Sequence, residues 1–259
     1  MTALLDLLSG LTGFGPEMVW RGFLVFIRAG AALALLPVYG DQQIPVRVRL
    51  VLALALALVV APVVMPGLPE SEGGLIGPIL IEAAVGLVLG FGLRLLVLAL
   101  QFAGVVAAQA ISIAQLTADA GPEPLPALSQ FLIAAGLALA VALDLPVRAA
   151  ELLILSYQAF PAGLAPQPGP VADWGLRQTV QAFALGFTLA TPFLAAAVLY
   201  NLAIGLINRA MPQLMVTMIG APALVLGGLL LLALSGPIML SVWADALAAH
   251  YADPFGTLP

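Results

Sequence analysis

The sequence predicts an all-α membrane protein of about six long apolar helices, arranged as helical hairpins with proline-broken loops. Of its 259 residues, 63% are hydrophobic and only 8% are charged, and the mean hydropathy is +1.14. Soluble domains carry about a quarter charged residues, whereas a membrane helix needs about 20 mostly apolar residues in a row. The third observation is the position of the prolines, at which the apolar runs end or break. We expect residues 1–259 to form a single integral membrane domain.

Composition also excludes several kinds of site. Cysteine is absent, which excludes disulfides, thiolate metal sites and a cysteine nucleophile. All eight cations are arginines, the net charge is −5, and no basic cluster indicates nucleic-acid binding. The one histidine, His250, is more typical of an interface residue than of a metal ligand. We therefore expect no metal, no cofactor and no catalytic residue.

The N-terminal residues 1–15 are weakly amphipathic. They have no basic region before the apolar residues, and Asp6 lies within the first turns, so they do not resemble a cleavable signal peptide. An interfacial helix or a packing arm is expected here.

The first long apolar run, residues 17–37, contains two arginines. Arg21 and Arg28 are seven residues apart and therefore share one helix face. Because an arginine facing lipid is costly, this face should meet protein or water. The run ends at Pro37, and a second run of almost pure Leu, Val and Ala follows over residues 50–65.

The third run, residues 76–100, carries Glu82, Gly86, Gly90 and Arg94 at steps of four. The two glycines have the small-x-x-x-small spacing that lets another helix approach closely. Glu82 and Arg94 are three turns apart, too far to pair along one helix. Each is expected to find a partner elsewhere, in this chain or in another.

Residues 101–119 differ from the runs before them, because they mix small, apolar and amide side chains. Gln101, Gln109 and Gln115 suit the wall of a water-filled passage better than a lipid-facing surface. The prolines of residues 121–126 then rule out regular helix. Irregular backbone at membrane depth is tolerated only against protein or a cavity.

A fourth run, residues 127–143, is broken by Asp144-Leu145-Pro146, and a shorter helix is expected over residues 147–159. In it, Arg148 and Glu151 have the i,i+3 spacing of a local ion pair. The prolines between residues 161 and 170 predict a second irregular loop that extends to Trp174.

The fifth run, residues 178–208, exceeds one crossing, and Thr191-Pro192 can kink it. Asn201 and Asn208 share one face, where an amide usually bonds a neighbouring helix. Arg209 lies at the helix end, within reach of last-turn carbonyls or lipid headgroups.

Pro212 should break the chain at Met211. The last run extends from Leu214 past Pro237 to His250. By spacing alone, the two runs form a hairpin of two membrane helices with an arginine anchor.

Orientation in the membrane is left open by the arginines. A conventional topology would place Arg47, Arg49, Arg94 and Arg209 on or near one side and Arg21, Arg148 and Arg177 on the other. Four against three does not decide the matter under the positive-inside rule.

The stretch from Asn208 to Leu214 (NRAMPQL), followed by Ile219-Gly220-Ala221-Pro222, resembles the C-terminal signature of the FliR family. That family belongs to the export gate of the flagellar type III secretion apparatus and has relatives in virulence injectisomes. The length and the order of apolar segments fit along the whole chain, and Ser156 to Gly163 resembles the family's Ser-to-Pro-x-Gly ending. The chain departs from the family at Met215, where an Asn is common, and at residues 143–146, where a Gly-His-type turn is frequent.

The resemblance implies a single FliR-like domain that is a non-enzymatic subunit of the export gate in the bacterial inner membrane, in the flagellar basal body. FliP-like and FliQ-like subunits would complete the channel with it, FlhB-like and FlhA-like components would lie nearby, and unfolded protein would be exported. It places a channel plug at Ile113, Gln115 and Leu116. Further residues of interest are the turn motif Asn208, Arg209, Pro212 and Gln213, and the interhelix polar residues Asn201, Glu82 and Arg94.

Other functions remain open at this point. An injectisome export-gate subunit would carry the same features, and the plug residues could form an ordinary surface loop. A secondary transporter would show matched broken helices in two halves, whereas the breaks at Pro192 and at residues 120–126 are not obviously matched. An intramembrane enzyme would have to rely on a carboxylate pair such as Asp144 and Glu151.

Overall fold

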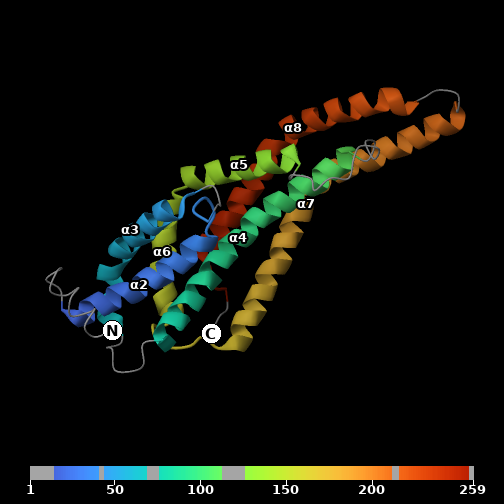
Figure 1. Cartoon of the computed structure of the whole chain (residues 1–259). Coiled ribbons are helices and arrows are strands. Elements are labelled where there is room, and N and C mark those ends of the chain that lie inside the picture. The colour runs from blue at the N-terminus through green and yellow to red at the C-terminus, as the bar shows by residue number, and fades with distance from the viewer. Residues whose placement is uncertain (1–14, 41–43, 69–75, 113–125, 212–215, 257–259) are drawn as a thin grey trace. The chain divides into compact units, whose positions relative to one another are not determined.

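The computed structural model describes residues 15–40, 44–68, 76–112, 126–211 and 216–256, and within them every regular element is a helix (Figure 1). This confirms the all-α prediction. In chain order the helices are α2 (Pro16–Leu35), α3 (Val46–Val64), the 3₁₀ turn η1 (Met65–Gly67), α4 (Ile76–Ser112), α5 (Ala127–Ala142), α6 (Leu145–Ala159), α7 (Pro168–Ala210) and α8 (Val216–Ala252).

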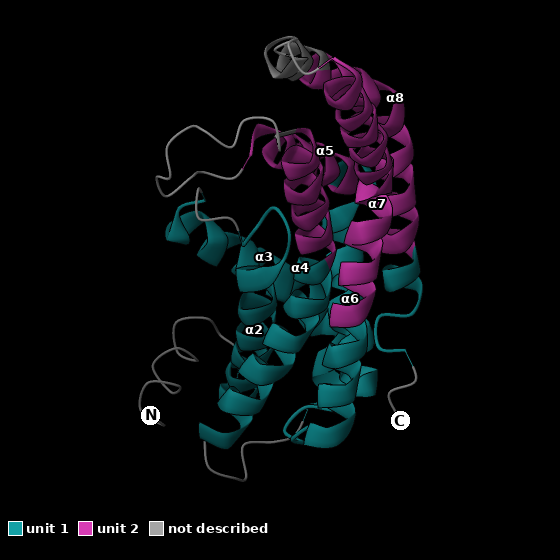
Figure 2. Ribbon diagram, turned by 90° about the vertical axis from the view of Figure 1, so that its right-hand side faces the viewer, with its two compact units in different colours: residues 1–95, 141–178, 249–259 teal, residues 96–140, 179–248 magenta. Residues whose placement is uncertain are grey.

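The chain divides into two compact units (Figure 2). Unit 1 comprises Met1–Leu95, Val141–Gln178 and Ala249–Pro259, and unit 2 comprises Leu96–Ala140 and Thr179–Ala248. The long helices α4, α7 and α8 each contribute one part to unit 1 and the other part to unit 2.

Five helices of the described chain are long and apolar enough to cross a membrane, or up to six spans if the pair α5 and α6 counts as one. α5 and α6 meet at a bend of 73°. The break lies where Asp144-Leu145-Pro146 predicts it, and Asp144 adopts a left-handed conformation, with φ of 60°. A short polar residue tolerates this backbone better than an apolar one does. The chain is a multi-pass membrane protein by this architecture.

One expected boundary is wrong. The proline-rich loop ends earlier than predicted, because α7 begins at Pro168 and includes Pro170. Proline lacks only an N–H that the first helical turn leaves unbonded anyway, so prolines can start a helix as readily as they break one. The apolar third run and the amide-rich residues that follow it form one helix, because α4 continues to Ser112. Glutamine is a good helix former, so a change of polarity there need not end a helix.

Unit 1 packs around α2. This helix lies against α3, and against the part of α4 that carries Gly86 and Gly90. A Cβ at Gly86 would collide with the Arg28 carbonyl, and one at Gly90 would lie 2.5 Å from the Ala32 carbonyl oxygen. The small-x-x-x-small spacing therefore does bring two helices together, and the helix that approaches is α2.

Unit 2 packs around the C-terminal part of α4. α5 approaches it closely where Gly104 faces Ser129, whose hydroxyl donates to the Gln101 carbonyl at 3.0 Å. α7 places Phe183 and Phe187 edge-on against Phe102, with ring centroids 5.4 and 4.8 Å apart. α8 adds a hydrogen bond, in which the indole N–H of Trp243 donates to a main-chain carbonyl of α4 at 2.9 Å. The core of unit 2 is therefore helix on helix around α4.

Candidate functional site: a buried ion pair and an apolar hairpin

Unit 1 encloses a charged cluster among apolar helices. The Arg28 guanidinium donates from Nε to Oε2 of Glu82 at 2.6 Å and from Nη2 to Oε1 at 3.1 Å. Both side chains are fully buried. The two-point geometry is the strong form of an arginine–carboxylate contact. It joins α2 to α4, directly beside the close approach at Gly86.

Helix α6 completes the cluster. Arg28 Nη1 donates to the Ser156 hydroxyl at 3.0 Å, and Nη2 also donates to the Phe160 carbonyl at 3.1 Å. The Tyr157 ring lies over the guanidinium, 3.6 Å from the Arg28 Cζ to the ring centroid. Its hydroxyl donates to Glu82 Oε2 at 3.4 Å. The guanidinium is therefore bonded on several sides and also stacked on a ring.

These contacts explain how two charges survive in apolar helices. A buried ion pair is stable only when its geometry is good and its remaining donors and acceptors are bonded. Both conditions hold for Arg28 and Glu82. Glu82 is expected to find a partner in this chain or in another, and unit 1 itself supplies that partner as Arg28. Arg21 also reaches protein, because its Nη1 lies 3.4 Å from the Met65 carbonyl oxygen.

The other interhelix residues lie elsewhere. Arg94 lies half-buried on α4, and within the described residues it makes no ion pair. Asn201 and Asn208 are exposed on α7, as is Arg209 in the last turn of that helix. Their roles stay predictions.

The structure does confirm that the helix ends before Met211, because the last residue of α7 is Ala210. The expected plug residues Ile113, Gln115 and Leu116 and the turn residues Pro212 and Gln213 lie outside the described residues.

The end of α7 and the start of α8 form an apolar hairpin in unit 2. At residues 201–211, around the end of α7, only Ile204 is partly buried and every other side chain is exposed. Leu202 and Leu206, for example, are 61% and 62% exposed. α8 continues the surface with Leu226, Leu230 and Leu234. An exposed apolar surface of this kind belongs in lipid or against other protein.

A small cavity lies at the base of this hairpin. It measures about 240 Å³ and lies where Ile111, near the end of α4, meets α7 and α8. Its lining is almost wholly apolar, with Phe193, Tyr200 and Leu231 among the larger side chains. Gly228 allows the contact, because a Cβ there would lie 2.5 Å from Ile111 Cδ1. The residues that follow Ile111 are those expected to form the plug.

The described residues hold no cluster of three or more His, Asp or Glu side chains that could bind a metal ion. The exposed pair Arg148 and Glu151 forms the predicted i,i+3 ion pair, at 2.9 Å. Its carboxylate is thus already held by an arginine at the surface.

Sequence reasoning did not find the contribution of α6. The apolar pattern marks Arg28 and Glu82 as charges in need of partners, whereas the stretch that contains Ser156 and Tyr157 enters only through the family resemblance and not as a partner of these charges. A serine and a tyrosine one residue apart in an apolar helix give only a weak signal. A search of the other apolar helices for hydroxyl side chains that could bond the charged residues could have suggested them.

A helical, multi-pass architecture with an internally neutralised ion pair and an exposed apolar hairpin defines an integral membrane protein. Residues 19–250 match the family described as "Bacterial export proteins, family 1", and the chain belongs to that family.

Several curated relatives are named flagellar biosynthetic protein FliR. The protein of Caulobacter vibrioides is 36% identical over 232 residues, which cover 88% of this chain and 92% of the relative. The proteins of Escherichia coli and Pectobacterium carotovorum are each 25% identical and cover 84% of both chains.

Proposed function

We propose that this chain is a non-enzymatic subunit of the flagellar type III protein export gate, embedded in the bacterial inner membrane at the flagellar basal body. The observation that carries the proposal is the family match over residues 19–250, together with a relative named as a flagellar biosynthetic protein along almost its whole length. In this proposal residues 1–259 act as one domain. FliP-like and FliQ-like subunits complete the channel, and FlhB-like and FlhA-like components lie beside it.

The apolar hairpin supports a role inside a larger membrane assembly. Lipid could cover its leucines, but Asn201, Asn208 and Arg209 are exposed on the same helix. Amide groups in a membrane seek hydrogen-bond partners on neighbouring helices. We assign the hairpin to the contact with partner subunits, and the turn Asn208 to Gln213 to fixing its tip.

In the same proposal, Ile113, Gln115 and Leu116 help to close the channel. Bulky apolar side chains at a constriction exclude ions by dewetting, and a moving polypeptide can displace them. The segment follows Ile111, which lies beside the apolar cavity of unit 2.

The decisive experiment separates assembly from closure. The chain is co-expressed with FliP-like and FliQ-like subunits, and the complex is purified and reconstituted. We expect one stable complex that contains this chain, and an ion leak after deletion of residues 113–120 without loss of assembly. Failure to co-purify would refute the export-gate function. A correctly assembled deletion variant that stays ion-tight would refute the plug alone.

The alternatives have less support. An injectisome subunit of the same superfamily would match the same family model, but the curated relatives carry flagellar names. For a secondary transporter, the cavities at the hairpin base and between α3 and α6 offer almost no polar lining for a solute. A stable, monodisperse protein that transports a solute without partners would favour that alternative.

A further inference from the structure

Both helices of the apolar hairpin contain a proline in their interior. Pro192 lies inside α7 and Pro237 inside α8. A proline has no N–H to donate to the carbonyl four residues earlier, and its ring clashes with that carbonyl, so the helix kinks there. The weakened turns are therefore residues 188–192 of α7 and 233–237 of α8. In Figure 1 both helices bend partway along their length.

The two weakened turns lie at the same height along the hairpin. α7 ends at Ala210, and α8 begins at Val216 and runs back along it (Figure 1). Residues 188–192 lie 18–22 residues before the end of α7, and residues 233–237 lie 17–21 residues after the start of α8. The cavity at the hairpin base fits this register, because its lining spans residues 193–200 of α7 and 224–231 of α8. The break in one helix is thus matched by a break in the other.

Hydroxyl and glycine residues weaken the same turns further. Three hydroxyl side chains beside the breaks donate to the carbonyl four residues earlier on their own helix, at distances of 2.7–3.0 Å, and these are Thr188, Thr191 and Ser235. Such bonds compete with the main-chain ladder and often bend helices. In α8, Gly236 directly precedes Pro237 and has more backbone freedom than any other residue. The local chemistry of both helices therefore favours a variable bend at this height.

Packing differs on the two sides of the breaks. On the side of the unit 2 core, two phenylalanines of α7 pack edge-on against Phe102, and Trp243 of α8 donates to the main chain of α4. On the hairpin side, the cavity of about 240 Å³ leaves space beside Ile111. The side chains at residues 201–211, apart from Ile204, are exposed. A change of angle at the breaks would disturb few contacts on the hairpin side, while the core side stays fixed.

From these observations we propose that residues 188–192 and 233–237 form a paired hinge, about which the hairpin beyond it pivots as one body. The use of this motion rests on the proposed function, in which the hairpin meets partner subunits and must set its angle against them. Leu206 lies about 24 Å along the helix from the centre of the hinge, at a rise of about 1.5 Å per residue. A change of about 20° in the bend, the size of an ordinary helix kink, moves it by about 8 Å.

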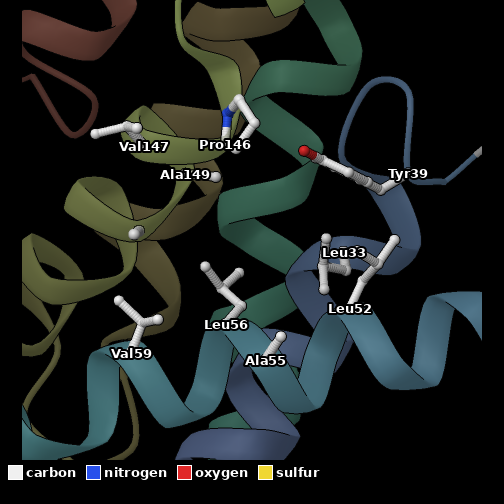
Figure 3. A pocket seen from close by; sticks show the side chains of 10 residues that line it. Leu33, Tyr39, Leu52, Ala55, Leu56, Val59, Pro146, Val147 and Ala149 are labelled. Atoms are coloured by element: carbon white, nitrogen blue, oxygen red, sulfur yellow. The ribbon is translucent and has the colours of Figure 1, made fainter.

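Unfilled space alone does not make a hinge. A larger pocket of about 370 Å³ lies between α3 and α6 in unit 1 (Figure 3). Its one proline, Pro146, lies in the first turn of α6, where a proline removes no helix hydrogen bond. Unit 1 therefore lacks, at this pocket, the pair of breaks that unit 2 has beside its cavity.

The test measures distances between spin labels in the full chain in nanodiscs. The sequence contains no cysteine, so labels attach only at introduced cysteines. Leu206→Cys with Phe131→Cys places one label on the hairpin and one on α5, and both native side chains are exposed. Leu206→Cys with Leu230→Cys places both labels beyond the hinge. We expect a broad distance distribution for the first pair, about 8 Å wide or more by the lever-arm estimate, and a narrow distribution for the second pair.

Restoring the missing N–H groups should stiffen the hinge. The double variant Pro192→Ala/Pro237→Ala should narrow the distribution of the first pair at least about twofold, because both helix ladders become continuous. Pro62→Ala is the matched control, since it removes a proline from the interior of α3, outside the hairpin, and it should leave the distribution unchanged. Equal widths in the double variant and in Pro62→Ala would overturn the hinge. A second pair as broad as the first would also overturn it, because the hairpin would then not move as one body.

Hydrogen exchange provides a second measurement on the assembled complex, for the case that the free chain does not stay monodisperse. Peptides that contain residues 188–192 and 233–237 should exchange faster than a peptide from residues 197–208, and the double proline variant should slow them. Equal exchange in all three peptides, or no change in the variant, would overturn the hinge. Neither measurement uses export or the identity of the partners as its readout, so failure of the hinge is distinguishable from failure of the proposed function.

Discussion

Removing one side of the buried ion pair should be far more damaging than removing both. In Glu82→Leu, the Arg28 guanidinium loses its two carboxylate contacts, at 2.6 and 3.1 Å, and keeps only the Ser156 hydroxyl, the Phe160 carbonyl and the Tyr157 ring. An uncompensated buried charge of this kind costs about 3–5 kcal/mol. For a chain of this size, that corresponds to a fall in Tm on the order of 10 °C.

The exposed ion pair on α6 provides the matched control. Glu151→Leu breaks a pair whose side chains are both 51% exposed, and such surface pairs contribute about 0–1 kcal/mol. The double variant Arg28→Met/Glu82→Leu removes both buried charges, and its stability should return close to that of the native protein.

The assay is thermal unfolding in mild detergent, followed by fluorescence-detected size-exclusion chromatography of the purified protein or complex. The expected order of Tm places Glu82→Leu lowest, with the double variant and Glu151→Leu both near the native value. If Glu82→Leu melted no earlier than Glu151→Leu, the ion pair would not stabilise unit 1, and the reasoning from burial would fail.

Three further predictions concern packing and assembly. Gly90→Leu should separate α2 from α4 and lower the Tm by several degrees, because its side chain would collide with the α2 backbone. Gly77→Ala should leave the Tm unchanged in the same assay, because a Cβ at that position meets no atom within 4 Å. Arg209→Ala and Pro212→Leu should reduce the yield of assembled complex in co-purification, and any loss of conduction should follow from that loss of assembly. Full assembly combined with blocked export would mean that the turn lines the export path. Trp243→Phe should cost about 1 kcal/mol in thermal unfolding, because it deletes one buried hydrogen bond to α4, and an unchanged Tm would show that this bond contributes nothing.

Local chemistry along the chain predicted much of the fold. The break at Asp144-Leu145-Pro146 and the end of α7 before Met211 both follow from proline, which acts on its immediate neighbours. The same local reasoning was wrong for the start of α7 at Pro168, because a proline in a first turn and a proline in a loop look alike in a sequence.

The site could be predicted only in part, because its contacts are not local. Arg28 and Glu82 are 54 residues apart, and Arg28 and Phe160 are 132 apart. Apolar patterning identifies both charges as anomalous, but it contains no information on which helix lies beside which. The Gly86 and Gly90 spacing predicted a close approach, yet only the folded structure identifies α2 as the helix that approaches.

The separation of Arg28 from Glu82 has a consequence for biosynthesis. A ribosome adds about 5–20 residues per second, so the 54 residues between them take about 3–11 seconds to make. During that interval α2 has emerged with a charge whose carboxylate does not yet exist. The helix must therefore wait at the insertion machinery, or near the lipid headgroups, until α4 is made. A nascent chain arrested before Glu82 should consequently leave α2 extractable from membranes by alkali, whereas one arrested after α6 should hold it firmly in the bilayer.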